Sequence, residues 1–302
     1  MTWSLYHRKG GKATMKAYKG FHKDMICTPG NGTTFQYKEG ETYEEPKADL
    51  CEGGFHACLD PLDCVSYYTL YDSVYHEVEL EGVSDQVDEC GTKVCGTKIK
   101  IGKRLDVGEM IEASVNFAKE HRDEKVGEVK YILNEKPHNQ VASGARNNRI
   151  VSDGKFTNLA SSSYFGRIVN SGEFARLATS ACSGQLANNG DFVKMASSGQ
   201  DNRIANSGDF VHIVSCSDFA EIVTSGKNCV VMASGIFARV KAALGTWITL
   251  VEWAQEAALV KPVAIVTAKV DGETVKADTW YVAKNGKLKE VPYEEQKKPK
   301  ED

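Results

Sequence analysis

Three cysteines and one histidine, Cys51, His56, Cys58 and Cys64, lie within a single stretch of fourteen residues. Thiolate and imidazole groups are the usual ligands of zinc, and structural zinc sites take them at short, regular spacings such as C-x2–4-C. The cysteines here are separated by six and then five residues, and no CxxC pair occurs. We therefore expect no metal, and we interpret the thiols as small buried groups. His56, between Phe55 and Ala57, is interpreted as a hydrogen-bonded core or pocket residue.

Two carboxylates, Glu77 and Glu79, could serve as acid or base in the segment VYHEVELEG (74–82). They alternate with Val78 and Leu80, which is the pattern of an antiparallel strand with one solvated face. From the pattern alone, both are interpreted as solvated strand positions.

A third group consists of basic side chains spaced by multiples of nine residues: Arg149, Arg167, Arg176, Lys194, Arg203, His212 and Arg239. If successive nine-residue units alternate between two faces, Arg176, Lys194 and His212 form one outward column. The others form a second column, interleaved with Gln185 and Glu221. Like charges at strand spacing repel, and the interleaving relieves that repulsion, as an ordinary solvated surface would. The alternative is that these residues bind an anionic polymer or an acidic partner.

The repeat that places these side chains has a period of nine residues. Every ninth position from Val141 to Val240 is large and aliphatic, and seven of the eleven phenylalanines stand three residues before such a position. Glycine recurs two residues before the phenylalanine. Nine residues suit one short strand and one turn, so the sequence predicts a parallel β-solenoid over 136–244, with eighteen residues and two strands per coil. We expect about six coils, with the aliphatic and aromatic positions facing inward.

Two other rods with short repeats fit less well. Nine is not a multiple of five, which argues against a pentapeptide rod. The residues after the turn glycine form a mixture that cannot build the row of calcium ligands of a metal-binding roll: Lys155, Glu173, Asp191, Gln200, Asp209 and Lys227.

The flanking segments complete the predicted organisation. Residues 15–105 are expected to form a small α+β head, and 106–135 a helical connector whose helix has Asp106 as its N-cap. Residues 245–293 should cap the rod with two hairpins, turning at Asp271–Gly272 and Asn285–Gly286. We expect a leader without structure at 1–14, because Met15 is an equally plausible start, and a disordered charged tail at 294–302.

Composition narrows the class of protein. The formal net charge is −4, which makes nucleic acid an unlikely partner. No apolar run approaches the roughly 20 residues of a membrane span, and the N-terminus lacks the apolar core of a secretory signal. Nine cysteines, an odd number, favour a reducing cytoplasm over a disulfide framework.

The first third of the chain contains sequence motifs that resemble those of a known family. The combination KAYKGF…GFHACLDPLDCVSYY…VYHEVELEG…KIKIG, over about 15–115, resembles an uncharacterised N-terminal domain of phage and prophage proteins. This resemblance implies a phage source and a location in the bacterial host cytoplasm, and it implies no particular chemistry.

The order of the segments is also similar to that of ADP-ribosyltransferase folds. That resemblance implies NAD as cofactor, with Lys19 and Gly20 in the first motif, Phe55 and His56 in the second, and Tyr67 or Tyr68 against the nicotinamide. Glu77 or Glu79 would be the catalytic acid. Three features depart from that family: lysine stands where it has arginine or histidine, no Ser-Thr-Ser is present, and the E-x-E comes too soon after the second motif.

We therefore expect a mainly β, non-enzymatic accessory protein of phage origin. It would bind a host or viral protein through head and solenoid, would need no cofactor, and could form a homo-oligomer. Inhibition of a host defence is one such role. The alternative is an ADP-ribosyltransferase-like or nucleotide-binding head that the solenoid targets or oligomerises.

Overall fold

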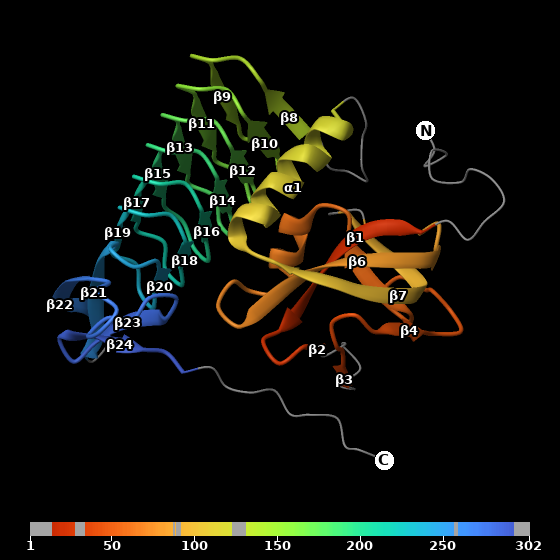
Figure 1. The fold of residues 1–302 in the computed structure, drawn as a ribbon. Coiled ribbons are helices and arrows are strands. Elements are labelled where there is room, and N and C mark those ends of the chain that lie inside the picture. Colours follow the sequence, from red (N-terminus) through yellow and green to blue (C-terminus); the bar gives the residue numbers. More distant parts are fainter. Residues whose placement is uncertain are drawn as a thin grey trace. The chain divides into compact units, whose positions relative to one another are not determined.

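The structure is a computed structural model, and it describes residues 14–27, 34–86, 88, 92–122, 131–256 and 259–292. Residues up to Asp106 form one compact unit, here called the head, and residues from Val107 onward form a second (Figure 1). The predicted leader at 1–14, except Thr14, and the predicted tail at 294–302 lie outside the described residues. No helix in the described ranges is long and apolar enough to cross a membrane.

The head is a small β-sheet domain. Its main sheet has the order β4-β7-β5-β1-β6, and β6 also pairs with β7, so that β1, β5, β7 and β6 close on one another. The strands are β1 (Met15–His22), β4 (Thr42–Glu44), β5 (Phe55–Cys58), β6 (Ser73–Val83) and β7 (Lys93–Leu105). A separate ribbon pairs β2 (Ile26–Cys27) with β3 (Phe35–Gln36), and the 3-10 helix η1 (Pro61–Ser66) follows β5. Asp60 caps η1 by accepting a hydrogen bond from the backbone N–H of Leu62.

The second unit is a parallel β-solenoid, as the nine-residue period predicts. Four-residue strands alternate between two sheets, and each pairs with the strand eighteen residues onward, as Ile150 does with Ile168. The first sheet, sheet E, contains β8 (Tyr131–Asn134), β10 (Arg149–Ser152), β12 (Arg167–Asn170), β14 (Gln185–Asn188), β16 (Arg203–Asn206), β18 (Glu221–Thr224) and β20 (Arg239–Ala242). The second, sheet F, contains β9 (Gln140–Ser143), β11 (Asn158–Ser161), β13 (Arg176–Thr179), β15 (Lys194–Ser197), β17 (His212–Ser215) and β19 (Val230–Ala233).

The solenoid is longer than predicted, with about seven turns over 131–250. β8 precedes the first recognisable repeat and pairs with β10, and β21 (Trp247–Glu256) pairs with β19 after the repeat has faded. Pairing with a regular neighbour is enough to hold these terminal strands, so they do not need the repeat's glycine and phenylalanine.

The aliphatic register lies inside the solenoid, as expected: Ile168, Ile204, Ile213 and Ile222 are fully buried. The prediction that the phenylalanines also face inward is wrong, because all seven have 43–68% of their surface exposed. Each occupies a turn with a positive φ of 55–58°. This left-handed conformation directs its backbone N–H to the next coil, as from Phe174 to the Asp191 carbonyl at 2.9 Å.

The turn glycines are required because successive coils come very close together. A Cβ atom added to Gly190 would lie 2.1 Å from the carbonyl oxygen of Gly172, in the coil before. Beneath these glycines runs a column of fully buried asparagines, Asn170, Asn188 and Asn206. Each donates to the carbonyl of its own turn glycine at 2.7–2.8 Å, and Asn170 and Asn188 also donate to the next asparagine at 2.8 Å. Buried polar groups are therefore satisfied from coil to coil.

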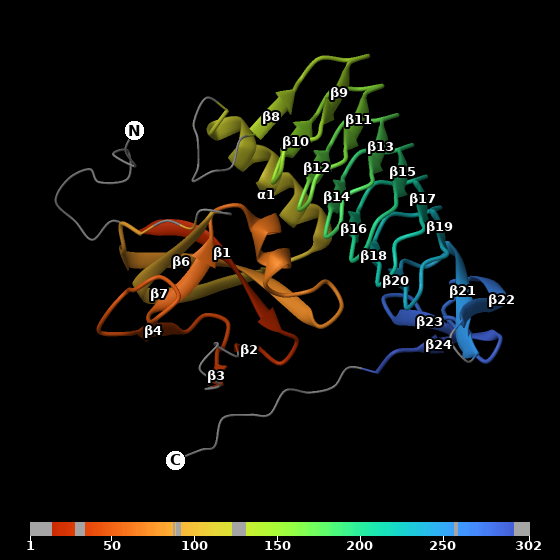
Figure 2. The same cartoon turned by 180° about the vertical axis from the view of Figure 1, so that it is seen from behind.

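The helix α1 (Val107–Glu120) starts directly after Asp106, the predicted N-cap, and packs on sheet E of the solenoid, against β8 to β16 (Figure 2). It buries Met110, Ile111, Val115, Phe117 and Ala118. Lys119 forms an ion pair of 2.6 Å with Asp153 beside β10. Residues 107–120, expected to be a connector, therefore cover one face of the solenoid.

The cap contains one of the two predicted hairpins. β23 (Trp280–Lys284) and β24 (Lys287–Glu290) pair across Asn285–Gly286, as predicted. The hairpin predicted at Asp271–Gly272 is wrong, because β22 (Leu259–Lys269) pairs with the preceding β21. Asp271 instead accepts three backbone N–H bonds, from residues 273 to 275, and so forms a local turn.

Candidate functional site

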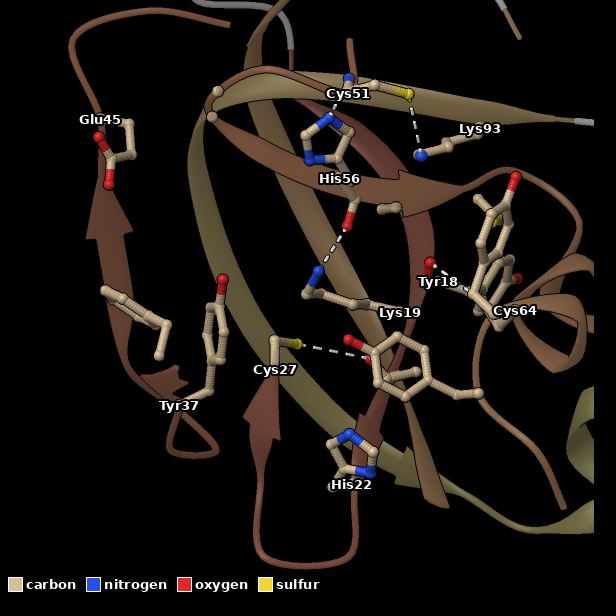
Figure 3. A pocket seen from close by; sticks show the side chains of 18 of the residues that line it. Tyr18, Lys19, His22, Cys27, Tyr37, Glu45, Cys51, His56, Cys64 and Lys93 are labelled. Carbon is tan, nitrogen blue, oxygen red and sulfur yellow. Dashed lines mark hydrogen bonds between the residues drawn. The ribbon is translucent and has the colours of Figure 1, made fainter. Parts of the chain in front are cut away.

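The head contains a cavity of about 780 Å³ that opens to solvent (Figure 3). Strand β1 supplies Lys19 and Gly20, β5 supplies His56, and the segment after η1 supplies Tyr67 and Tyr68. Other lining residues include Phe35, Tyr37, Glu45, Cys51 and Lys93. Of the residues that the transferase resemblance singled out on β1, β5 and the following aromatic segment, all but Phe55 therefore line one cavity.

Lys19 is the buried cation of this cavity, with 8% of its surface exposed. Its Nζ donates to the backbone carbonyl of His56 at 2.8 Å and lies 5.6 Å from the ring centres of Phe21 and Tyr37. Among the described residues no carboxylate forms an ion pair with it. A buried ammonium group is costly unless it is paired, so Lys19 is well suited to receive an anion.

Gly20 is required next to Lys19 because the ring of Tyr68 lies directly on the backbone there. A Cβ atom at Gly20 would approach the Tyr68 ring to 2.7 Å. The carbonyl of Tyr68 accepts a 2.6 Å bond from the hydroxyl of Tyr75, which fixes this segment. Burial raises the pKa of the Tyr68 phenol, so the group stays neutral and presents a flat aromatic wall.

His56 is held as a neutral, structural imidazole. Its Nε2 accepts the backbone N–H of Cys51 at 2.8 Å. Burial, reinforced by the ammonium groups of Lys93 and Lys19, lowers the pKa of His56 to about 4. Because Nε2 already accepts a hydrogen bond, His56 is poorly placed to act as a general base.

Among the described residues, the cysteines near His56 included, no group of three or more side chains that could bind a metal comes together. The Cys64 thiol donates to the Tyr18 carbonyl at 3.3 Å. Its hydrogen bond with Cys58, together with burial, raises the pKa of the Cys58 thiol. Cys51 is exposed at the cavity, with its Sγ 3.4 Å from the Nζ of Lys93. Lys93 in turn lies 4.9 Å from the centre of the Tyr67 ring.

Neither candidate catalytic glutamate lines the cavity. In the β1–β6 pairing Lys19 is opposite His76, whereas Glu77 is opposite Tyr18, so strand alternation places Glu77 on the other face from Lys19. Glu77 forms an ion pair with Lys16 at 3.0 Å. Glu79, also on that face, lies 3.8 Å from Lys100.

The solenoid offers a second surface, the outer face of sheet F. Arg176, Lys194 and His212 are exposed there on adjacent strands, as the sequence indicated. Beside them runs a shallow groove of about 570 Å³ lined by alanine, serine and threonine side chains. Together they form a flat basic stripe flanked by small residues.

The second basic column, predicted to face solvent, is largely covered. Arg149 and Arg167 are only 5% and 4% exposed, on the face of sheet E where α1 packs. Arg149 donates to the Tyr131 hydroxyl at 2.8 Å, and Arg167 to the Gln185 side chain at 2.9 Å. Arg203 lies 3.9 Å from Glu221, and Arg239 is half-buried. Arg149 and Arg167 are therefore held by neutral hydrogen-bond partners under α1, and of these four residues Arg203 has a carboxylate, that of Glu221, within 4 Å.

Sequence reasoning missed one feature of the surface, a ladder of stacked rings along the turns that lead into sheet F. His138, Phe156, Phe174, Phe192 and Phe210 stack with centroids 4.9–5.0 Å apart and planes within 7° of parallel. The eighteen-residue spacing of these phenylalanines was the available signal. The faces of these rings pack against one another, and the ring edges are exposed at the surface.

Residues 15–113 match the model of a domain of unknown function, DUF7666. This match agrees with the expected uncharacterised domain and covers about the same stretch of chain. Neither the curated proteins nor the solved structures gave a match.

Proposed function

We propose that this chain is a non-enzymatic interaction protein with two recognition sites. The head cavity binds a small ligand that carries an anionic group and a planar ring. The outer face of sheet F binds an acidic protein. The family resemblance supports a phage source, and with it a host protein in the bacterial cytoplasm as partner and inhibition of a host defence as the role.

The observation that carries the proposal is the Lys19 ammonium at the cavity. Glu45 and Glu52 also line the cavity, but among the described residues neither forms an ion pair with Lys19, so an anionic group could take that place, and Tyr37 and Tyr68 would contact a flat ring. A volume of about 780 Å³ lies in the range of small-molecule sites, which is about 300–1,000 Å³. A nucleotide combines phosphate, ring and suitable size, so the nucleotide-binding alternative is the form of the head's function that we favour.

Binding without turnover is supported by the position of the acids and bases. Glu77 and Glu79 lie on the opposite face of their strand, and His56 is neutral and already hydrogen-bonded. Transfer chemistry needs a carboxylate at the developing positive charge, and the two glutamates that do line the cavity, Glu45 and Glu52, are not on β6, where the transferase resemblance puts the catalytic acid.

The ligand is tested by calorimetry with AMP, ATP and NAD, with adenosine as the uncharged control. We expect the phosphorylated compounds to bind, and adenosine to bind at least tenfold more weakly. Lys19→Met should remove binding while the protein still folds, because a buried cation is replaced by an apolar chain of similar length. Lys16→Met, on the same strand with its side chain on the opposite face, is the matched control and should bind normally.

The absence of chemistry is tested with a tagged NAD analogue. No labelling of lysate proteins is expected, and Glu77→Ala and Glu79→Ala should bind ligand as the unaltered protein does. Labelling that either substitution abolishes in a normally melting protein would establish the transferase alternative. Equal nucleotide affinity in Lys19→Met would refute the cavity site.

The solenoid site is tested by retention on immobilised poly-glutamate. Retention should fall with added salt and be lost in the double variant Arg176→Glu/Lys194→Glu, because charge pairing at an exposed stripe is screened. Lys227→Glu, a charge reversal at an exposed turn outside the stripe, should leave it intact. Retention that survives the double variant would place the acidic partner elsewhere.

A further inference from the structure

The two outer faces of the solenoid are built alike, and a helix packs on one of them. On sheet E the third residue of each strand, such as Val169, is buried on the face where α1 packs. The corresponding residue of sheet F lies nine positions further along the chain, and there Ala178 is exposed. The first residues of the strands correspond in the same way, with Arg167 buried on sheet E and Arg176 exposed on sheet F. Sheet F therefore exposes the kind of face that α1 covers on sheet E.

The groove on sheet F has the length of a short helix. Its lining extends from Ala142 to Val214 and Cys216, so it crosses the five strands β9, β11, β13, β15 and β17. Four steps of about 4.8 Å make about 19 Å, which is the length of about thirteen residues of α-helix. The fourteen residues of α1 likewise cross five strands of sheet E, from β8 to β16 (Figure 2). A helix that lies across the strands, as α1 does, would fill the groove.

The charge beside the groove favours an acidic helix. Arg176, Lys194 and His212 stand in a column two residues before the alanines and the valine that line the groove. Among the described residues neither Arg176 nor Lys194 forms an ion pair. The residues of this column are about 4.8 Å apart, and successive turns of an α-helix are about 5.4 Å apart. Carboxylates at positions i, i+3 and i+7 of a helix can therefore each face one member of the column.

The acidic side chains nearest in sequence to the column are already engaged within the solenoid. Glu173, Asp191 and Asp209 precede the strands, on the side of the column away from the groove, and each pairs with a lysine or accepts a backbone N–H of the next coil. Beyond the groove, Asp201 lies 3.8 Å from an arginine, and Asp218 accepts a backbone N–H at 2.7 Å. The basic column is thus available to carboxylates of another chain.

We propose that an α-helix of an acidic partner protein binds along this groove, with one row of carboxylates facing Arg176, Lys194 and His212. This inference rests on the proposed function of sheet F as the site for an acidic protein, and it adds the form in which that protein is bound. The small alanine and serine side chains let the helix approach the sheet closely, so the side of the helix that faces them carries small or aliphatic residues.

Fluorescence anisotropy with the full chain and two labelled peptides tests the proposal. The first is an alanine-based peptide as long as α1, with glutamates at i, i+3 and i+7. A lactam bridge on its opposite side keeps it helical, because a free helix of this length is marginal in water. The second carries the same charge and a central proline, which breaks the helix. We expect the helical peptide to bind at least tenfold more tightly.

This comparison separates the helix from the acidic partner. Equal affinity for the two peptides, with poly-glutamate still retained through Arg176 and Lys194, would overturn the helix and leave the proposed acidic partner. Failure of both peptides and of poly-glutamate to bind would overturn both proposals.

The substitution Ala178→Trp separates the groove from the charge. A large side chain at this exposed position fills the groove without changing the basic column, so the affinity for the helical peptide should fall at least tenfold while retention on poly-glutamate persists. Met232→Trp, at the same position of β19 and outside the groove, is the matched control and should bind the peptide normally. Both positions are exposed, so both variants should melt as the unaltered protein does. Undiminished affinity for the helical peptide in Ala178→Trp would overturn the proposal.

Discussion

Replacing Gly190 by alanine should destabilise the solenoid far more than loss of a glycine ordinarily does. The new Cβ would lie 2.1 Å from the Gly172 carbonyl oxygen, whereas real Cβ atoms essentially never come within 3.0 Å of another atom. Backbone lies on both sides of the contact, so no flexible side chain can yield. The turn must therefore move by about 1 Å relative to the coil before it.

A shift of that size breaks part of the asparagine column. Asn188 donates to the Gly190 carbonyl at 2.7 Å and accepts from the Gly190 N–H at 3.2 Å, and both bonds are buried. Asn170 donates to the neighbouring Gly172 carbonyl at 2.7 Å. Losing two or three such bonds at about 1 kcal/mol each lowers the free energy of unfolding by about 2–3 kcal/mol. For a unit of this size that corresponds to a melting temperature lower by about 5–10 °C.

Thermal unfolding followed by circular dichroism measures this effect. The matched control is Gly144→Ala, whose Cβ would have its nearest neighbour, the Ser162 hydroxyl oxygen, at an ordinary 3.4 Å. Gly144 has no positive φ, so alanine there should change stability by less than about 0.5 kcal/mol. If Gly190→Ala melts within 1 °C of the unaltered protein, close approach of the coils is not what requires glycine.

Three further perturbations test other parts of the reasoning. Ile213→Asp should lower the free energy of unfolding of the solenoid by several kcal/mol, because it buries an unpaired carboxylate. His212→Asp, at the adjacent exposed position, should leave the melting temperature nearly unchanged. Equal melting temperatures for the two variants would contradict the inward placement of Ile213. The head should lose stability as pH falls from about 6.5 towards 4, because His56 takes up a proton in the unfolded state more readily than in the folded state. The expected loss in the free energy of unfolding is about 1–2 kcal/mol after allowing for partial exposure, and it should be absent in His56→Gln. EDTA should leave the melting temperature unchanged, and a drop that calcium restores would show that metal stabilises the turns.

The solenoid could be predicted from sequence because one position in nine is subject to a severe constraint. Residues such as Ile168 and Ile213 are fully buried inside the solenoid, so a large aliphatic side chain is needed at this position in every repeat. Phe174 recurs as strictly, yet for a different reason: it occupies a left-handed turn and stacks on its neighbours. Hydrophobicity alone does not separate these two causes of periodicity, which is why the inward placement of the phenylalanines failed.

The packing of α1 on sheet E could not be predicted. The pattern of an amphipathic helix shows which of its faces is buried, but it does not show which part of the protein that face packs against. The apolar face of α1 was visible in Met110 and Val115, but its position over Arg149 and Arg167 depends on the fold. The cavity in the head was likewise only partly visible. Lys19, His56 and Tyr68 were singled out by a resemblance, whereas Glu77 and Glu79 were excluded only by the pairing register.

The eighteen-residue step has a consequence for how such a chain can evolve. Because every coil offers the same backbone bonds to the next, one coil can be duplicated or deleted without altering the surfaces that remain, provided that the change is a multiple of eighteen. α1 sets a lower bound on that freedom: its fourteen residues span about 21 Å, close to the roughly 19 Å between β8 and β16. The helix therefore fixes the number of the first coils, from β8 to β16. The number of coils can differ between relatives in the stretch from β17 to β20, and the length of the solenoid would change with it.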